Sequence, residues 1–596
     1  MRDFRVAVML DEDAWRGANR AGRNWWPAYY PEILARMGLP HDVIGPEHLS
    51  AEGLAGYDVL LLPGNGGRAG KPAPPDGNST GSPEAIADWV EAGGLLIGFA
   101  TEGLDALFGI EVEDTLDHMG DEFTPSGCIR LCDEEWTLQL LPPHEQHSAL
   151  PIIAPMRVAE APECRELARL LSFFEQDLHR PAVTWREVGE GAACWWAFDL
   201  AECLWKVHQG RPVYEDFDGD GKLRTMDAVA TRPWPAEIPY ADLMLMTLRR
   251  IIAERGAVFL SQLPPTDEGS VPDALFHWGG DDEADPDVSI PAAKFMAVLD
   301  LPYHINIMPN PPGTHPLPRE DFERLGELGC ERSIHFNFIT HSEHPFAFTK
   351  ADLARQLEDY LAAYGEMPVC TVFHWVSWTG WAEPARWLSE LGLRGDNNRI
   401  HWRYPPVNPT NRVAFAFGTA WPFHYLDAWR HKNARIDFVS LPICGYEVGH
   451  FAGRFEPSQL HRAIELAGRW GLTMSLFIHP VRLTEDAPRQ AVQEALRHID
   501  RLGLRAMHLG TDALCEWWHE RDCSVVECVE VGERQTRVTI RAESERGCVV
   551  EMRARGDAPE VTVDGESVDP CVRERCGDRW LAVGLPEGRS RVSVRW

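Results

Sequence analysis

The chain has 596 residues, of which 44% are hydrophobic and 25% charged, so its length exceeds one ordinary domain and predicts about two to four. Its formal net charge of -34 argues against nucleic-acid binding, because a phosphate backbone needs a basic patch and the sequence shows none. No apolar run is long enough to span a bilayer and no signal peptide precedes the first expected strand, so we expect a cytoplasmic protein without membrane contact.

Residues 1–262 alternate expected strands and helices in the manner of a doubly wound parallel sheet. Strands are expected at 6–10, 57–64 and 93–98, and a helix at 83–92. The segment 64–82 is rich in glycine, proline and polar residues, which predicts a loop.

Two segments of this region resemble the class I glutamine amidotransferase-like fold of ThuA-like proteins and of the trimerisation domain of some β-galactosidases. They are the strand that enters Pro-Gly-Asn-Gly at 63–66 and the Gly-Gly-Leu-Leu-Ile-Gly-Phe run at 93–99. Active members carry a nucleophilic cysteine in a G-x-C-x-G elbow, and Ala100 stands in its place here, which excludes glutaminase chemistry. The resemblance implies a flavodoxin-like, non-catalytic domain with a scaffolding, oligomerising or sugar-binding role, and a homo-oligomer built through it.

Residues 216–227, DFDGDGKLRTMD, match the EF-hand or dockerin-type calcium loop. Oxygen ligands stand at positions one, three and five, a glycine at six and a carboxylate at twelve. We expect a structural calcium ion, and the alternative is a solvated acidic loop. The expected ligands are Asp216, Asp218, Asp220, Lys222 and Asp227.

After a linker at 263–272, residues 273–521 again alternate strands and helices, which predicts a closed or nearly closed (β/α)7-8 barrel. The expected strands are 274–278, 304–308, 331–338, 369–375, 400–404, 436–441, 474–479 and 506–510. Residues 524–596 alternate apolar and polar positions over short runs and predict a small β-sandwich, in which we identify no site.

Two adjacent carboxylates, Asp281 and Asp282, follow the apolar run 274–278 and a glycine pair. Neighbouring side chains at a strand end point in different directions, so one aspartate can bind a metal ion while the other handles a proton. The alternative is an ordinary turn, since glycine and aspartate dominate turns. Histidines stand at other strand ends, and the mouth of a barrel brings such ends together.

This order of residues resembles the polysaccharide deacetylase, or NodB-type, family. The resemblance implies that Asp281 is the catalytic base, Asp282 a metal ligand, His335 the first metal histidine and His479 the catalytic acid. The spacing departs from the family after His335, because Ile339 occupies the place of the second histidine. We take His341 as that ligand and keep His344 as the alternative.

The usual Arg-Pro-rich motif of the family is not recognisable, and Phe-His-Trp-Val-Ser-Trp at 373–378 occupies its approximate place. We assign His374, Trp375 and Trp378 to substrate binding, because indole rings stack on the apolar faces of sugars. The alternative for each tryptophan is ordinary packing.

The leading hypothesis is a metal-dependent, carbohydrate deacetylase-like hydrolase. Two imidazoles and one carboxylate would hold zinc, or else cobalt, nickel or manganese, and lower the pKa of a bound water towards ~7. Asp281 would then accept the proton and His479 would protonate the leaving group. One alternative is a glycoside hydrolase with two facing acids, and another is a non-catalytic carbohydrate-binding or scaffold protein. The acids considered for the glycosidase are Glu283, Asp285, Asp396 and Glu447.

Overall fold

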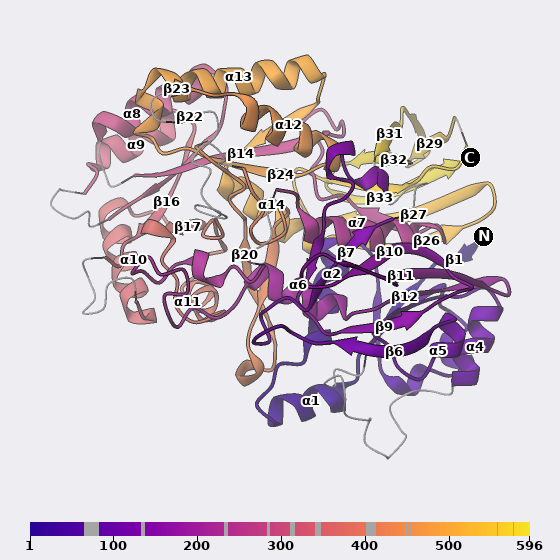
Figure 1. Ribbon diagram of the computed structural model, residues 1–596. Coiled ribbons are helices and arrows are strands. Elements are labelled where there is room, and N and C mark those ends of the chain that lie inside the picture. The colour runs from indigo at the N-terminus through magenta and orange to yellow at the C-terminus, as the bar shows by residue number, and fades with distance from the viewer. Residues whose placement is uncertain are drawn as a thin grey trace.

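The computed structural model is a mixed α/β protein in which two large sheets and a smaller pair of sheets pack against one another (Figure 1). The structure describes residues 1–64, 83–132, 138–231, 237–282, 286–309, 316–339, 347–400, 413–447, 450–451, 454–556, 558–575 and 577–596.

The first large sheet has the strand order β3-β2-β4-β5-β12-β11-β10-β7-β8. Its parallel part is β3 (Asp42–Ile44), β2 (Val6–Met9), β4 (Val59–Pro63), β5 (Leu95–Phe99) and β12 (Gly191–Trp196). This order is that of flavodoxin-like doubly wound sheets. Strands β4 and β5 are buried along their whole length, as parallel strands covered on both faces must be.

An antiparallel extension, which the sequence pattern did not predict, continues this sheet beyond β12. It consists of β11 (Asp177–Val188), β10 (Arg165–Leu171), β7 (Gly127–Leu131) and β8 (Leu150–Ile152). A separate antiparallel two-stranded sheet pairs β6 (Glu111–Leu116) with β9 (Met156–Glu160). The helices of this region are α1 (Glu12–Arg20), α2 (Tyr30–Arg36), α3 (Ala51–Leu54), α4 (Pro83–Glu91), α5 (Asp105–Phe108), α6 (Leu200–Gln209) and α7 (Tyr240–Ala253).

The second large sheet has the order β19-β20-β18-β17-β16-β15-β14-β24-β21, and β25 pairs with the start of β14. Its strands are β14 (Ala274–Asp282), β15 (Tyr303–Ile307), β16 (Cys330–Phe336), β17 (Cys370–Phe373), β18 (Gly395–Asp396), β19 (Phe423–Leu426), β20 (Arg435–Ser440), β21 (Gly445–Tyr446), β24 (Thr473–Phe477) and β25 (Ala506–Leu509). All its ladders are parallel except β19 with β20.

This sheet is a curled half-barrel and not the closed or nearly closed barrel that the sequence predicted. From β14 to β20 on one side, and from β14 through β24 to β21 on the other, neighbouring strands pair as they do in a barrel. A closed barrel would also need β20 to pair with β21, and no ladder among the described residues joins these two strands. The strand expected at 400–404 lies almost entirely outside the described residues. The short strands β18 and β21, each of two residues, gave no sequence signal.

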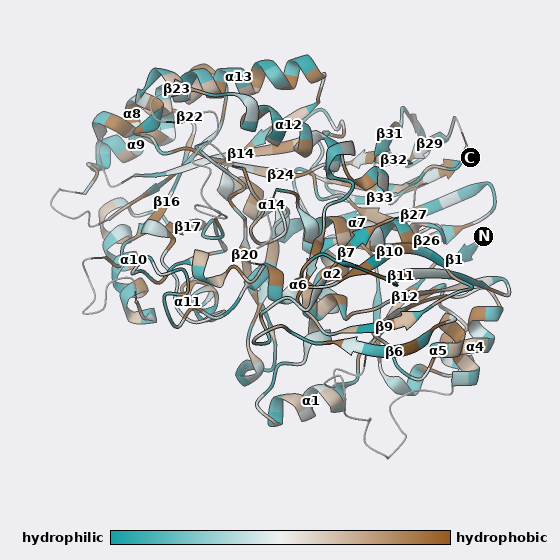
Figure 2. Ribbon diagram, viewed as in Figure 1, coloured by the Kyte–Doolittle hydropathy of each residue, from teal (hydrophilic) through white to brown (hydrophobic). Residues whose placement is uncertain are grey.

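Helices cover the outer face of the half-barrel (Figure 1). They are α8 (Pro286–Val298), α9 (Arg319–Glu327), α10 (Lys350–Tyr364), α11 (Glu383–Glu390), α12 (Ser458–Trp470), α13 (Asp486–Leu502) and α14 (Thr511–Cys523). Figure 2 shows α13 carrying both hydrophilic and hydrophobic residues, as expected of a helix with one buried face. Among the described helices, none combines the length and apolar character that crossing a bilayer requires.

The two smaller sheets form the C-terminal part, and both recruit strands from earlier in the chain. One contains β1 (Arg2–Asp3), β26 (Val525–Val531), β27 (Gln535–Ala542), β33 (Gly588–Arg595), β29 (Glu560–Val563) and β30 (Glu566–Val568). The other contains β13 (Val258–Leu260), β28 (Cys548–Arg553), β32 (Asp578–Leu585) and β31 (Cys571–Arg575). The β-structure is therefore wider than the predicted 524–596.

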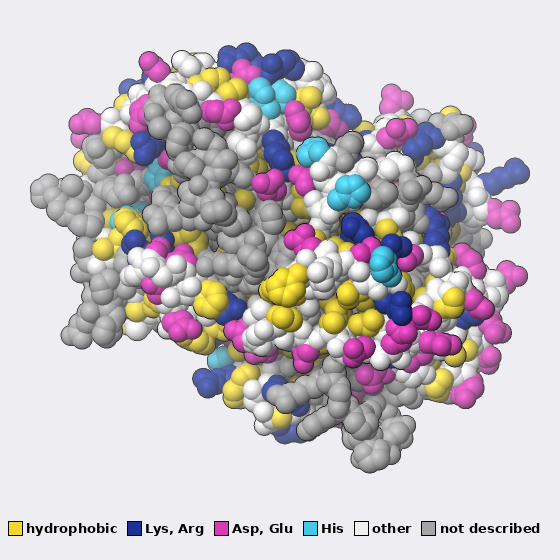
Figure 3. Space-filling model, viewed as in Figure 1, with side chains coloured by type: hydrophobic (Ala, Val, Ile, Leu, Met, Phe, Trp, Pro, Cys, Tyr) yellow, Lys and Arg dark blue, Asp and Glu magenta, His cyan; other side chains and the backbone are white. Residues whose placement is uncertain are grey.

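Acidic side chains are spread over the face drawn in Figure 3 and gather around the β6–β9 pair, where the first four residues of β6 are exposed. This surface agrees with the net charge of -34.

Candidate active site

The sheet brings three of the predicted site residues to one edge. Asp281 lies at the end of β14, His335 near the end of β16, and His479 two residues after β24. Strand β14 pairs with β24 on one side, and the Ile478 N–H donates to the Gly279 carbonyl at 2.8 Å. Because parallel strands end at a common edge, side chains far apart in sequence meet there.

Asp281 lies between two imidazole rings. Its Oδ1 is 2.6 Å from His479 Nε2, and its Oδ2 is 3.5 Å from His335 Nε2. Burial raises the pKa of Asp281, but the charge of His479 outweighs burial and holds this pKa below its ordinary value. Asp281 is therefore an ionised carboxylate that is only 8% exposed.

His479 contacts a second carboxylate through its other ring nitrogen. Its Nδ1 lies 2.9 Å from Oε1 of Glu447, which directly follows β21, and Glu447 also pairs with Arg482 at 3.4 Å. Burial lowers the pKa of His479, but the charges of Asp281 and Glu447 outweigh burial and raise this pKa well above its ordinary value. This direction favours the protonated ring. Nδ1 is within hydrogen-bond distance of Glu447, and Nε2 forms a close ion-pair contact with Asp281 Oδ1 that lacks hydrogen-bond geometry.

His335 has a different arrangement of protons. Its Nδ1 lies 2.8 Å from the Val372 carbonyl, which only accepts, so Nδ1 is a donor, and in the neutral form of the ring Nε2 carries the lone pair. The ring is fully buried, and Nε2 meets no hydrogen-bond partner among the described residues. Its distance of 3.5 Å from the Asp281 carboxylate exceeds that of a hydrogen bond. A lone pair facing a carboxylate across such a gap fits a metal cation, and histidine ligands commonly donate their other N–H to a carbonyl.

Asp282 lies beside Asp281 and is 3% exposed. Successive side chains of a strand point to opposite faces, so Asp282 shares the face of Trp278, and Asp281 shares the other. Burial, together with the charge of Asp282, raises the pKa of Tyr364 on the outer helix α10 to about 12. The carboxylate in contact with both histidines is thus Asp281, and the role of Asp282 as a metal ligand stays a prediction.

The predicted second metal histidine, His341 with the alternative His344, lies outside the described residues. The structure places a different histidine next to His335: the ring of His374 is 5.3 Å from it, and His374 Nδ1 lies 3.2 Å from Oδ1 of Asn337. Burial, with the charge of His335, lowers the pKa of His374 to about 3, so this ring is neutral. The sequence had assigned His374 to the substrate.

The two tryptophans assigned to the substrate have different environments. Trp375 is 46% exposed and adopts a φ of 60°. Trp378 is fully buried: its Nε1 donates to the Trp381 carbonyl at 3.1 Å, and the Arg399 guanidinium lies 4.5 Å from its ring centre. The prediction that Trp378 binds substrate is therefore wrong, because this side chain fills the core.

The calcium-type loop packs against the same segment. Trp378 N–H donates to the Leu223 carbonyl at 3.1 Å, Val213 and Gly380 exchange backbone hydrogen bonds of 2.8 and 2.9 Å, and Lys222 Nζ lies 4.3 Å from the Trp375 ring centre. The N-terminal region thus supports the exposed tryptophan, a contact between distant segments that the sequence pattern could not show.

Within this loop, Asp216, Asp218 and Asp227 each offer a carboxylate oxygen within 4.8 Å of the other two. Asp220, also expected to bind the ion, forms an ion pair with Arg224. Three of the five expected ligands therefore lie together, and calcium binding stays a prediction.

The segment whose sequence resembles the amidotransferase elbow contains an unusual backbone conformation. Ala100 has a φ of 50°, in the left-handed region that non-glycine residues rarely adopt. Thr101 Oγ1 donates to the Leu62 carbonyl at 2.6 Å and accepts the Phe99 N–H at 3.0 Å, so this hydroxyl is already engaged.

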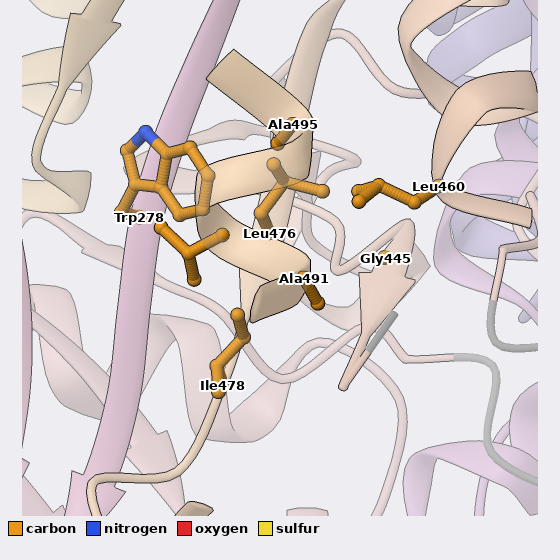
Figure 4. Close-up of a pocket in the computed structure, with 8 residues that line it drawn as sticks. Trp278, Gly445, Leu460, Leu476, Ile478, Ala491 and Ala495 are labelled. Carbon is orange, nitrogen blue, oxygen red and sulfur yellow. The ribbon is translucent and has the colours of Figure 1, made fainter. Parts of the chain in front are cut away.

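A small apolar cavity lies on the helix side of β14 and β24 (Figure 4). Its volume is about 10 Å³, and it is lined by Trp278, Gly445, Leu460, Leu476, Ile478, Ala491, Val492 and Ala495. This volume suits at most a water molecule, so the cavity is no substrate site.

Comparisons with known proteins found no matching family model and no matching curated protein. Solved structures do match. "Crystal structure of Agd3 a novel carbohydrate deacetylase" has 9% identity and a TM-score of 0.43 and covers 100% of this chain and 98% of that one. A putative polysaccharide deacetylase from Mycobacterium smegmatis has 14% identity, a TM-score of 0.30 and coverage of 43% and 94%. A β-galactosidase from Rahnella sp. R3 has 20% identity and a TM-score of 0.24, covers 33% of this chain, and is itself spanned over only 29% of its length.

The structural neighbours thus include carbohydrate deacetylases and β-galactosidases. Their TM-scores, all below 0.5, mark a limited likeness, and the chemistry of this chain has to be derived from its own residues.

Proposed function

We propose that this protein is a metal-dependent hydrolase that removes an acyl group from a carbohydrate. The observation that supports this most directly is the position of Asp281 between His479 and His335. His335 Nε2 has no hydrogen-bond partner among the described residues, and His479, whose pKa is raised, lies 2.6 Å from the carboxylate. One side suits a metal ion and the other a proton donor, and metal-assisted hydrolysis of an amide or ester uses both.

The metal would be held by His335, by a second histidine and by a carboxylate of the Asp281-Asp282 pair. We keep Asp282 for this role, as the family resemblance implies, and Asp281, which lies on the side of His335, is the alternative. For the second histidine we keep His341, with His344 as the alternative, and add His374 because it lies next to His335. Zinc is the first choice, and cobalt, nickel and manganese suit the same ligands. A divalent ion here lowers the pKa of a bound water towards ~7.

The proton transfers are performed by residues of the chain. Asp281, kept ionised by the charge of His479, accepts a proton from the attacking water. His479 gives its Nε2 proton to the leaving nitrogen or oxygen. Glu447 accepts from Nδ1 throughout, which fixes the ring and stabilises its positive charge before the transfer.

A carbohydrate substrate is supported by the exposed ring of Trp375, which directly follows His374. An indole ring stacks on the apolar face of a pyranose, and Lys222 lies over the same ring. The calcium-type loop would then hold the sugar platform in place, and we propose a structural calcium ion bound by Asp216, Asp218 and Asp227, with Asp220 and Lys222 as further predicted ligands.

The glycoside hydrolase alternative fits the site less well. A glycosidase needs two acids that face each other across the substrate. Here Asp281 and Glu447 bind opposite nitrogens of His479, so the imidazole ring occupies the space between them. Of the other acids considered, Asp396 is fully buried, and Glu283 and Asp285 lie outside the described residues.

The decisive experiment combines metal content with acetate release from acetylated sugars. We expect His335→Asn and Asp282→Asn to lose the transition metal and the activity while calcium remains, and Asp281→Asn to lose activity but keep the metal. If Asp281→Asn loses the metal and Asp282→Asn keeps it, Asp281 is the metal ligand and Asp282 is the candidate base.

A suitable control is His461→Asn, which changes a histidine on α12 that pairs with Glu494 and should alter neither readout. A wild type that holds the metal but releases no acyl group from any sugar tested would favour the non-catalytic alternative.

A further inference from the structure

A second histidine cluster lies at the other end of the half-barrel sheet, where β19, β20 and α14 meet. It consists of His424, Asp437 and His519, each of which offers a ligand atom within 4.8 Å of the other two. The histidines are 1% and 5% exposed, whereas the side chain of Asp437 is 73% exposed. The two rings stand nearly perpendicular, at 85°, with their centres 5.1 Å apart.

Backbone carbonyls determine which nitrogen of each ring carries the proton. His424 Nδ1 lies 3.2 Å from the Ile436 carbonyl, and His519 Nε2 lies 3.0 Å from the Arg394 carbonyl. Since a carbonyl only accepts, these two nitrogens are donors, and in the neutral form of each ring the lone pair is at His424 Nε2 or His519 Nδ1. Histidines that bind metals are oriented in this way.

Both lone pairs face carboxylates. His519 Nδ1 is 3.1 Å from Asp437 Oδ1, and His424 Nε2 is 3.1 Å from Asp522 Oδ2. Nevertheless, His424 Nε2 has no hydrogen-bond partner of acceptable geometry among the described residues, although it is buried. An imidazole lone pair and a carboxylate oxygen are both hydrogen-bond acceptors, so a cation has to lie between them. This cation is either an extra proton on each ring or a metal ion.

The surroundings favour the metal ion over two extra protons. Two imidazolium rings 5.1 Å apart would repel each other, whereas one divalent ion satisfies both lone pairs. Asp522 also pairs with Arg435 at 2.6 Å and with Arg521 at 3.0 Å, so two cations besides His424 face this carboxylate.

A similar cluster elsewhere in the half-barrel has a different arrangement of protons. His304, Glu331 and Asp512 also bring ligand atoms within 4.8 Å of one another. There, Asn306 Nδ2 lies 3.2 Å from His304 Nδ1 and donates to it, so Nε2 carries the proton and lies 3.0 Å from Asp512. His304 Nε2, like His424 Nε2, has no hydrogen-bond partner of acceptable geometry among the described residues, but it directs a proton and not a lone pair to the carboxylate.

We infer that His424, His519 and Asp437 bind a divalent transition metal ion, with zinc as the first choice for two imidazoles and a carboxylate. The ion would tie the β19–β20 hairpin to α14, and the exposed Asp437 leaves room for a water ligand. We expect this site to be structural, because it lies where separate parts of the fold meet. The backbone N–H of His424 donates to Glu32 Oε1 at 2.9 Å, so the β19–β20 hairpin also contacts α2 of the N-terminal region. The inference does not depend on the proposed activity.

The test uses zinc alone as the probe, on the full chain with the proposed active-site ligands removed by Asp282→Asn and His335→Asn. We expect this background to bind about one zinc ion per chain in a calorimetric titration, and cobalt to give the visible absorption of a tetrahedral site. Adding Asp437→Asn or His519→Asn should weaken zinc binding at least tenfold. Because Asp437 is 73% exposed, Asp437→Asn should keep the fold, which circular dichroism checks.

The matched control is His498→Asn, which removes a histidine from a surface pair whose rings stack at 4.0 Å. It should leave zinc binding unchanged. The inference is overturned if the background binds no zinc, if zinc binding survives both Asp437→Asn and His519→Asn, or if His498→Asn abolishes it, which would indicate an adventitious ion only. A failure of acetate release in the wild type would concern the proposed function and leave this result unaffected.

Discussion

His479 Nδ1 lies 2.9 Å from Oε1 of Glu447, whose own backbone N–H donates to the Phe477 carbonyl at 2.8 Å. The carboxylate is thus attached to the strand that delivers the histidine, and the pair moves as one unit. Because the negative charge of Glu447 favours the protonated ring, this contact sets the pH range in which His479 can donate a proton.

Replacing Glu447 by glutamine should shift the pH profile of the enzyme. The proton donor is lost as pH rises through the pKa of His479, which Asp281 and Glu447 raise. Removing one charge lowers this pKa, so the alkaline limb of kcat/KM should move to lower pH by about one unit, or ~1.4 kcal/mol. Glu485→Gln, which removes a partner of Arg482 at 3.1 Å, should leave the limb in place. An unchanged limb in Glu447→Gln would refute the role of His479 as the acid.

The two neighbouring tryptophans should respond differently to alanine substitution. Trp375→Ala removes an exposed ring, and aromatic contacts contribute about 0.5–1.5 kcal/mol, so KM should rise up to roughly tenfold with little change in stability. Trp378→Ala leaves a cavity in the core and should lower the free energy of unfolding by about 3–5 kcal/mol. Steady-state kinetics and urea unfolding separate the two effects. Equal KM values for Trp375→Ala and wild type would exclude the sugar platform.

Calcium should stabilise the protein through the loop at 216–227. A ligand that binds only the folded state at a hundredfold excess over its Kd adds about 2.7 kcal/mol, so a chelator should lower Tm. Asp218→Asn should abolish this response, whereas Asp267→Asn, at a carboxylate that is 93% exposed, should not. Because the loop packs against Trp375, the chelator should also raise KM for the sugar. A Tm that is insensitive to calcium would support the solvated-loop alternative.

A buried ion pair should make stability depend on acid pH. Arg249 of α7 contacts Glu551 of β28 at 2.5 Å, and both side chains are less than 10% exposed. Burial raises the pKa of Glu551, but Arg249 and nearby arginines outweigh burial and hold it at about 2, below the value of about 4.3 in an unfolded chain. The ionised pair therefore stabilises the fold above pH ~4, and this contribution is lost as pH falls towards ~2.

Glu551→Gln should cost about 3–5 kcal/mol at pH 7, because it leaves Arg249 charged and buried, and it should remove this part of the acid dependence. Urea unfolding at several pH values measures both. Glu254→Gln breaks a pair with Arg250 at a carboxylate that is 36% exposed and should cost about 1 kcal/mol or less. Equal losses in the two variants would contradict the importance of burial.

The residues that sequence analysis located correctly are those at the ends of long apolar strands. Asp281, His335 and His479 each follow or end a run whose β character is visible locally, and parallel strands bring such positions to one edge without further information. The class of fold and the common place of these three side chains were therefore predictable.

Other features depend on contacts that leave no local trace in the sequence. Glu447 meets His479 only because a two-residue strand, β21, pairs with β24, and so short a strand has no periodicity. Trp375 and Trp378 have similar local sequence surroundings, so the sequence does not show which of them is buried. Trp378 is buried because it contacts Leu223 and Arg399, which come from distant segments. The open side of the half-barrel likewise depends on which strands pair and not on how many there are.

The pairing of Arg2 and Asp3 with Glu530 and Val531 joins the first strand of the chain to one of its last. During synthesis, β1 has no partner until more than five hundred residues have followed it out of the ribosome, and β13 waits similarly for β28. Both N-terminal strand edges must remain soluble throughout that interval. These two pairings can therefore form only late in synthesis, and a chain stopped before residue 525 would keep both edges exposed and prone to aggregation.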